Sequence, residues 1–230
     1  MNIELTELVF VLDRSGSMGG LESDTIGGFN GMIAKQKAQE KNVNVTTILF
    51  DDEVDIIHDR FPVEIIEPLT DKEYFVRGCT ALLDAVGTAI EKMENVQKHL
   101  PEDHRAGKII FVITTDGLEN SSEHFTQGQI RRKIEAKKVC GWEFLFLGAN
   151  IDAGREAEKI GIARNRSVTY ENDSEGIAVN FRAVGNALSK AVACDTTEDF
   201  LDDDWKDEIE EYHEKSHRQK RGQDLLGFFK

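Results

Sequence analysis

The sequence predicts an α/β fold built on a mostly parallel β-sheet with helices on both faces. Two apolar stretches, residues 8–12 and 108–115, have the length and the β-branched content of strands that are buried on both sides. Elsewhere, apolar residues recur every three or four positions, as they do along one face of a helix. Strands that alternate with helices favour a parallel, doubly wound sheet of the Rossmann-like class.

The remaining elements continue this alternation. Helices are predicted at residues 21–40, 82–100, 126–139, 153–160 and 177–191, and further strands at 43–50, 54–58, 142–147 and 167–170. Only three residues separate the strands 43–50 and 54–58, so these strands must pair antiparallel, and the second should lie at an edge of the sheet. Four acids of this hairpin lack the glycine and the terminal glutamate of an EF-hand, and we expect them to be solvated: Asp51, Asp52, Asp55 and Asp59.

Length and composition fit one sizeable α/β domain with an appendage, since the chain has 230 residues and 40% of them are hydrophobic. No run approaches the roughly 18 apolar residues of a membrane helix, and the first four residues do not resemble a signal peptide. We therefore expect a cytoplasmic protein that does not enter a membrane. Three widely spaced cysteines fit reduced thiols. The net charge of -15 argues against nucleic acid as a partner, because its phosphates require a basic surface.

The charge is unevenly distributed, and it divides the chain into a domain at residues 1–194 and a tail at 195–230. Residues 195–214 hold eleven acids and one base, whereas residues 215–230 hold five bases and one acid. The acidic part nevertheless carries an apolar stripe at helical spacing: Leu201, Trp205, Ile209 and Tyr212. Such a stripe indicates docking, either on the chain's own domain or on a partner.

The end of the tail combines basic, apolar and histidine residues. A basic patch is followed by an apolar end: Arg218, Lys220, Arg221 and residues 225–230. His213 and His217 have the spacing of two metal ligands on one helix face, but such pairs are mostly incidental. We therefore assign these histidines no role from the sequence.

Oxygen-bearing side chains follow the first predicted strand. This strand leads into Asp13, and Ser15 and Ser17 come next in a turn that Gly16 allows to be tight. One carboxylate and two hydroxyls at alternate positions can converge on a single point. Hard cations such as Mg²⁺ take oxygen ligands, so this donor set predicts part of a cation site.

Two later residues extend the same pattern. Thr80 lies just before the helix at 82–100, and Asp116, followed by Gly117, lies at the end of the strand at 108–115. In open sheets of this class, sites form beyond the carboxyl ends of strands, near the point where strand order reverses. Together the Asp-x-Ser-x-Ser, Thr and Asp-Gly motifs, in this order, resemble the metal-ion-dependent adhesion site (MIDAS) of the von Willebrand factor type A (vWA) domain family.

The resemblance covers about residues 4–194 and leaves the tail unexplained. It implies a six-stranded sheet with one antiparallel edge strand, which agrees with the pattern of elements above. The stretch Phe144-Leu-Phe-Leu-Gly-Ala-Asn150 is also similar to small stand-alone bacterial members of the family.

The resemblance also implies how the cation would be held. Ser15 and Ser17 would bind it directly through their hydroxyls, and Thr80 would do so in the ligand-competent state. Asp13 and Asp116 would bind it directly or through water. The expected ion is Mg²⁺, with Mn²⁺ and Ca²⁺ as alternatives.

The function that follows is a divalent-metal-dependent protein interaction module without enzymatic activity, in which an Asp or Glu of a partner protein completes the ion's coordination. One alternative is a Mg²⁺-dependent phosphohydrolase with Asp13 as nucleophile and Asp116 as a metal ligand. Its general acid would be expected two residues after the nucleophile, where Ser15 stands. The other alternative is a purely structural ion that holds three loops together.

Overall fold

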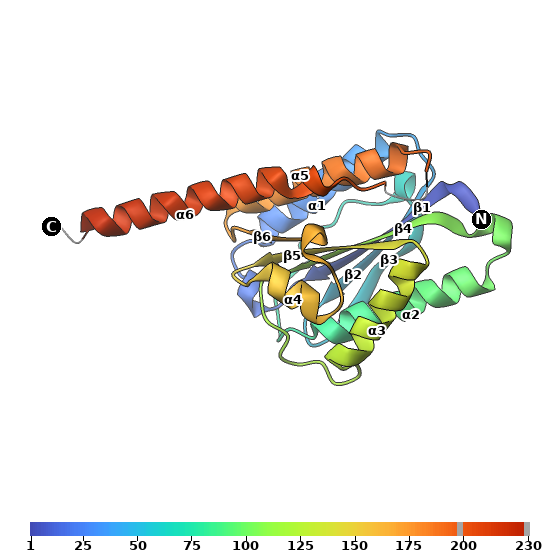
Figure 1. Ribbon diagram of the computed structural model, residues 1–230, viewed down its shortest axis with the longest axis horizontal. Coiled ribbons are helices and arrows are strands. Elements are labelled where there is room, and N and C mark those ends of the chain that lie inside the picture. Colours follow the sequence, from blue (N-terminus) through green and yellow to red (C-terminus); the bar gives the residue numbers. More distant parts are fainter. Residues whose placement is uncertain (197–199, 228–230) are drawn as a thin grey trace.

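A computed structural model describes the backbone of residues 1–196 and 200–227, and the side chains of these residues up to residue 218. The chain forms one six-stranded sheet in the order β3-β2-β1-β4-β5-β6 (Figure 1). The strands are β1 (Asn2–Asp13), β2 (Val43–Phe50), β3 (Val54–Pro62), β4 (Ala106–Thr115), β5 (Trp142–Ala149) and β6 (Ser167–Tyr170). All neighbouring strands are parallel except β2 and β3. The predicted mixed sheet with one antiparallel edge strand is confirmed.

Four strands are longer than the sequence predicted, β4 and β5 by two residues each and β1 and β3 by more. β1 begins at Asn2, although Ile3 is 60% exposed, because the backbone N–H of Asn2 still bonds to the carbonyl of Arg105 at 2.7 Å. β3 continues to Pro62 through register shifts on either side of Thr47. In both β1 and β3, backbone pairing extends beyond the apolar run. Side-chain periodicity cannot predict this extension, because the added residues do not continue the apolar run.

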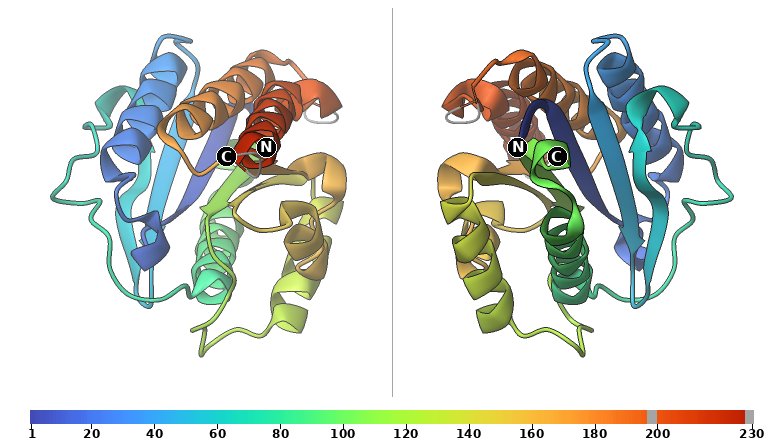
Figure 2. Two further views of the ribbon diagram at one scale, coloured as in Figure 1. Left: turned by 90° about the vertical axis from the view of Figure 1, so that its left-hand side faces the viewer. Right: turned by 90° about the vertical axis from the view of Figure 1, so that its right-hand side faces the viewer.

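Helices cover both faces of the sheet, as predicted (Figure 2). One face carries α1 (Glu22–Lys37) and α5 (Ser174–Ala193), and the other carries α2 (Leu82–His99), α3 (Gln127–Val139) and α4 (Ala153–Lys159). The central strands contribute to both layers because successive side chains of a strand point to opposite faces. Phe10 therefore packs under α1 and α5, whereas Val9 and Val11 pack under α2.

One glycine allows α1 and α5 to approach closely. A Cβ atom on Gly28 would lie 2.3 Å from the ring of Phe181 on α5. Any larger residue would force the two helices apart. Gly28, which weakens the helical signal of α1 in the sequence, is therefore a packing requirement of the α1–α5 layer.

The topology fixes where a site can form. The chain runs from β1 to its neighbour β2 on one side, and from β4 to its neighbour β5 on the other side. Strand order therefore reverses between β1 and β4, whose carboxyl ends lie at the same rim of the sheet. Asp13 is the last residue of β1, and Asp116 directly follows β4.

The apolar stripe of the tail packs against the chain's own core. Leu201, Trp205 and Ile209 are buried in the same cluster as α1 and α5, and Tyr212 is partly buried against it. The helical spacing of the stripe does not correspond to one continuous helix. Leu201 and Trp205 precede α6 (Asp207–Gly227), and Trp205 lies in a 3-10 turn at Asp203–Lys206.

Beyond the docked part, α6 continues past the edge of the sheet (Figure 1). Arg218 pairs with Glu214 at 2.9 Å, whereas the side chains of Lys220, Arg221 and residues 225–230 lie outside the described residues. The division at residue 194 stays a prediction. None of the helices in the described part of the chain has both the length and the apolar character that a membrane span requires.

We expect Trp205→Ala to lower the free energy of unfolding by about 3–5 kcal/mol, because it empties a buried site in the cluster under α5 and α6. The substitution also removes the hydrogen bond that the indole N–H of Trp205 donates to the carbonyl of Asn165 at 2.8 Å. Chemical denaturation measures the change. Val139→Ala is the control: this side chain is 89% exposed, so its loss should change stability by no more than about 0.5 kcal/mol. Equal effects of the two variants would contradict docking of the tail.

Candidate metal centre

The five residues singled out by the sequence meet at the rim between β1 and β4. They come from three segments, namely the loop after β1, the loop before α2 and the loop after β4. Four of them are buried and Ser17 is exposed: Asp13, Ser15, Thr80 and Asp116 form the floor. Their role as metal ligands stays a prediction, and the geometry below shows what they can do.

Asp13 anchors the first loop with both of its carboxylate oxygens. The backbone N–H of Ser15 donates to Oδ1 at 2.7 Å, and the hydroxyl of Thr115 donates to Oδ2 at 2.6 Å. Because Thr115 is the last residue of β4, this second bond ties the end of β1 to the end of β4. The backbone carbonyl of Asp13 in turn accepts from the buried hydroxyl of Tyr74 at 2.6 Å. Asp13 is therefore fixed on three sides.

The two serines lead from this anchor to Asp116. The hydroxyl oxygens of Ser15 and Ser17 lie 3.1 Å apart, and the hydroxyl of Ser17 donates to Oδ1 of Asp116. The other carboxylate oxygen of Asp116 accepts from the side-chain amide of Asn172 at 3.3 Å. Asn172, which follows β6, is a neighbour of the site that no sequence motif indicates.

Thr80 approaches the same point from the loop before α2. A Cβ atom built on Gly117 would lie 3.2 Å from the Thr80 hydroxyl and 3.6 Å from the Ser17 hydroxyl. The glycine after Asp116 therefore leaves open a space that both hydroxyls border. The backbone of Thr80 is held by Asn120, whose side-chain oxygen accepts from its N–H at 2.9 Å.

Burial shapes the electrostatics of the two carboxylates. Removal from water raises the pKa of Asp13 above its usual range, despite the hydrogen bonds from Ser15 and Thr115, and the nearby charge of Asp116 adds to the rise. Burial likewise raises the pKa of Asp116. Two partly desolvated negative charges at one rim are stabilised by a cation placed between them.

The donor set fits a small hard cation. Every side chain of the group offers oxygen and none offers nitrogen or sulfur, which favours Mg²⁺, Mn²⁺ or Ca²⁺ over softer metals. In an octahedral Mg²⁺ shell with bonds of about 2.0–2.1 Å, adjacent oxygens lie about 2.9 Å apart. The 3.1 Å between the Ser15 and Ser17 hydroxyls is close to this separation.

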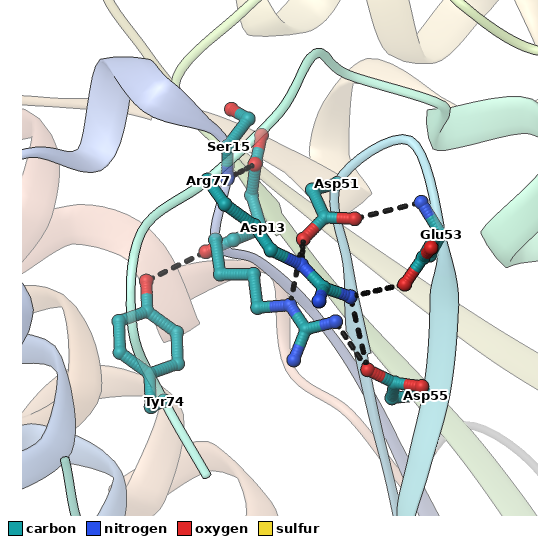
Figure 3. A network of polar contacts seen from close by, with 8 residues as sticks. Asp13, Ser15, Asp51, Glu53, Asp55, Tyr74 and Arg77 are labelled. Atoms are coloured by element: carbon teal, nitrogen blue, oxygen red, sulfur yellow. Dashed lines mark hydrogen bonds and ion pairs between the residues drawn. The ribbon is translucent and has the colours of Figure 1, made fainter. Parts of the chain in front are cut away.

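An ion network centred on a buried pair, Arg14 and Asp51, supports the loops of the site (Figure 3). Arg14, between Asp13 and Ser15, is 1% exposed, and its Nε donates to Oδ2 of Asp51 at 2.9 Å. Arg77 donates to the same Asp51 oxygen at 2.5 Å. Both arginines also reach Asp55, and Arg77 donates to Glu53 at 2.6 Å.

The expectation of a solvated hairpin is therefore wrong for Asp51, whose side chain is fully buried. Burial by itself raises its pKa, but the hydrogen bond and charge of Arg77, together with the charge of Arg14, outweigh burial and hold the pKa of Asp51 below its usual range. The sequence signal for this pairing is weak. Acids in a turn are usually solvated, and only the pairing of β1 with β2, continued by the bond from the Arg14 N–H to the carbonyl of Phe50, brings Arg14 to the hairpin.

Arg77 also joins the loop before α2 to the first loop. Its backbone N–H donates to the carbonyl of Arg14 at 3.0 Å, and the N–H of Gly16 donates to the carbonyl of Gly78 at 3.2 Å. Phe75 lies against both guanidinium groups, each 5.5 Å from its ring centre. The segments that carry Ser15 and Thr80 are thus bonded to each other directly.

We expect Asp51→Asn to lower the free energy of unfolding by about 3–5 kcal/mol, because it removes the buried carboxylate that pairs with Arg14 and leaves this guanidinium only the half-exposed Asp55. The loss should be full above about pH 5, where Asp51 is ionised in both the folded and the unfolded wild type, and it should narrow as the pH falls through the unfolded pKa of about 3.9 towards the lowered folded pKa. Denaturation at several pH values measures it. Asp59→Asn is the control, since its pair with Lys92 is exposed and should contribute less than about 1 kcal/mol. An equal loss in both variants would contradict the network's role.

Comparison with solved structures shows the class of fold. The von Willebrand factor domain of the type V pili tip protein Mfa5 from Porphyromonas gingivalis aligns with a TM-score of 0.61 and 11% identity, over 84% of this chain and 98% of that domain. The pilus adhesin SpaC from Lactobacillus rhamnosus GG, in its open conformation, aligns with a TM-score of 0.62 and 12% identity, over 83% of this chain and 30% of that one.

A third similar structure is proximal thread matrix protein 1 from the mussel byssus, which was solved with a zinc-occupied MIDAS motif. It aligns with a TM-score of 0.51 and 13% identity, and this chain spans 46% of its length. The sequence matches no protein-family model and no curated protein. At these identities the similarity is one of fold, and the fold of this chain is vWA-like.

Proposed function

We propose that this protein is a protein interaction module that works through a divalent cation at the rim between β1 and β4. Mg²⁺ is the ion we favour, held by the hydroxyls of Ser15, Ser17 and Thr80 and by the carboxylates of Asp13 and Asp116. The observation that carries the proposal is the convergence of these five oxygen-bearing side chains from three separate loops.

The arrangement suits recognition of an acidic side chain. When bound, the cation supplies a positive centre that can accept a carboxylate from outside the protein. The motif itself supplies two carboxylates, Asp13 and Asp116, and Asp13 already accepts hydrogen bonds at both oxygens. The site therefore keeps positive charge for a partner's Asp or Glu. The site is accessible from solvent on the side of Ser17, which is exposed.

The surface beside the rim supports docking of a peptide or loop. A cavity of about 230 Å³ adjoins Gly117, and its lining includes Leu118, Phe146, Ile151 and Lys159 together with the acids Glu119 and Glu156. Leu118 itself is 56% exposed. A partner segment that presents an acid to the cation could place an apolar neighbour here.

An enzymatic role has less support. Two of the similar structures come from a pilus adhesin and a pilus tip protein. The position two residues after Asp13 holds Ser15, whose hydroxyl contacts Ser17, so the chain has no carboxyl group there to protonate a leaving group. The residues present thus fit binding better than phosphoryl transfer.

We place the module in the cytoplasm, which stays a prediction. Cys79, Cys140 and Cys194 are all unpaired, and the first two are exposed. Exposed thiols are compatible with a reducing compartment, where they are not driven to form disulfides.

The first test is a comparison of partner capture in Mg²⁺ and in EDTA. We expect the wild-type protein to retain an acidic protein partner in Mg²⁺ and to release it in EDTA, and Asp116→Asn to capture none in either buffer. Asp59→Asn, which removes an exposed acid remote from the motif, should behave as wild type. Capture that survives EDTA and Asp116→Asn would contradict the proposal.

A thermal melt tests the cation separately from the partner. At a Mg²⁺ concentration a hundred times the Kd, we expect the wild type to gain about 2.7 kcal/mol of stability. Ser17→Ala should lose most of this gain but keep its fold, because Ser17 is exposed. A gain that depends on Ser17, together with partner binding unaffected by EDTA, would assign the ion a structural role only.

A further inference from the structure

The histidine pair of the tail lies against a buried carboxylate. Nδ1 of His213 is 2.8 Å and Nε2 of His217 is 3.1 Å from the same oxygen, Oε1 of Glu171. The two imidazole rings, one turn apart on α6, have centres 4.4 Å apart. The sequence offered no reason to connect these histidines with Glu171, which follows β6 more than 40 residues earlier.

We infer that Glu171, His213 and His217 form a second metal site, which binds a divalent transition metal such as Zn²⁺. One donor atom from each residue lies within 4.8 Å of the other two. In a tetrahedral zinc shell with bonds of about 2.0–2.1 Å, donor atoms lie about 3.3 Å apart. The two histidine–glutamate separations, 2.8 and 3.1 Å, are slightly shorter than this value, and the two histidine nitrogens lie within 4.8 Å of each other.

The orientation of His213 indicates shared ligation more than a simple ion pair. Its Nδ1 atom is buried, yet within the described residues it makes no hydrogen bond of acceptable geometry, although the Glu171 oxygen is only 2.8 Å away. The His213 ring is therefore not aligned for a hydrogen bond between Nδ1 and that oxygen. Nδ1 of His213 and Oε1 of Glu171 thus lie close together without a hydrogen bond between them, as two atoms do when both are ligands of one metal ion.

The site is built on rigid elements. Glu171 lies directly against the first turn of α5, where a Cβ atom on Gly176 would come within 2.2 Å of the Glu171 carbonyl oxygen. Asp173 caps this turn and also accepts a hydrogen bond from the hydroxyl of Tyr212 at 3.2 Å. The α6 helix is docked by the buried Ile209, so its histidines approach Glu171 from a fixed direction.

The donor set selects a different ion from the one at the rim. Two imidazole nitrogens and one carboxylate oxygen suit Zn²⁺ and related transition metals, with a fourth position for water, whereas the rim offers oxygen alone. His217 is 52% exposed, which gives an ion a path from solvent. A metal here would clamp the tail helix to the turn between β6 and α5.

Zinc titration of the full chain, monitored by calorimetry in excess Mg²⁺ to occupy the rim, tests this site. We expect His217→Ala and Glu171→Gln to remove one binding event or to weaken it at least about tenfold. His99→Ala combined with His104→Ala removes two histidines that lie outside the cluster, and it should leave the affinity unchanged. Ser17→Ala should also leave it unchanged.

A second measurement, the rate of proteolysis of α6, tests whether the metal fixes this helix and does not depend on partner binding. Zn²⁺ should slow proteolysis of α6 in the wild type and in Ser17→Ala, but not in His217→Ala. The inference fails if the wild type binds no Zn²⁺, if His217→Ala binds it as tightly as the wild type, or if Ser17→Ala alone removes the binding. Because Ser17 serves the rim and His217 serves the tail, failure of one site leaves the other measurable.

Discussion

The carboxylate of Asp51 is the interaction on which the rim of this protein depends. It is fully buried, and it accepts hydrogen bonds from two arginines that belong to different loops, Arg14 after β1 and Arg77 before α2 (Figure 3). Burying the charges of Asp51 and Arg14 costs solvation free energy, and that cost is offset only while they are paired with each other and with the partly exposed Arg77. The network therefore favours one arrangement of the loops over any other.

This arrangement positions the candidate ligands without involving them. Arg14 lies between Asp13 and Ser15, and the backbone carbonyl of Asp51 accepts the N–H of Ala81, the residue after Thr80, at 2.7 Å. One residue thus supports both sides of the proposed cation site. The ion pairs of Asp51 hold the loops in place without using the hydroxyls of Ser15 and Thr80, which remain free to face the rim. A metal site with few charged ligands needs such preorganisation in order to bind its cation.

The opposite side of the rim is connected to the tail. Asn172 donates to Asp116, its neighbour Glu171 contacts the two histidines of α6, and Asp173 accepts from Tyr212. Three consecutive residues therefore link a loop of the proposed interaction site to the C-terminal helix. The tail therefore packs against the turn that borders the proposed site, and it is not a separate appendage.

Local patterns in the sequence determined the α/β class, the antiparallel edge strand and the positions of Asp13 and Asp116 at strand ends. Strands buried on both faces must be continuous apolar runs, and covering helices must repeat every three or four residues, so both leave a signature that needs no knowledge of the fold. Only the tertiary structure decided that Asp51 is buried between two arginines and that Glu171 meets His213 and His217. Those partners are 26 to 46 residues apart. Their pairing follows from strand order and helix docking, which short-range periodicity does not encode.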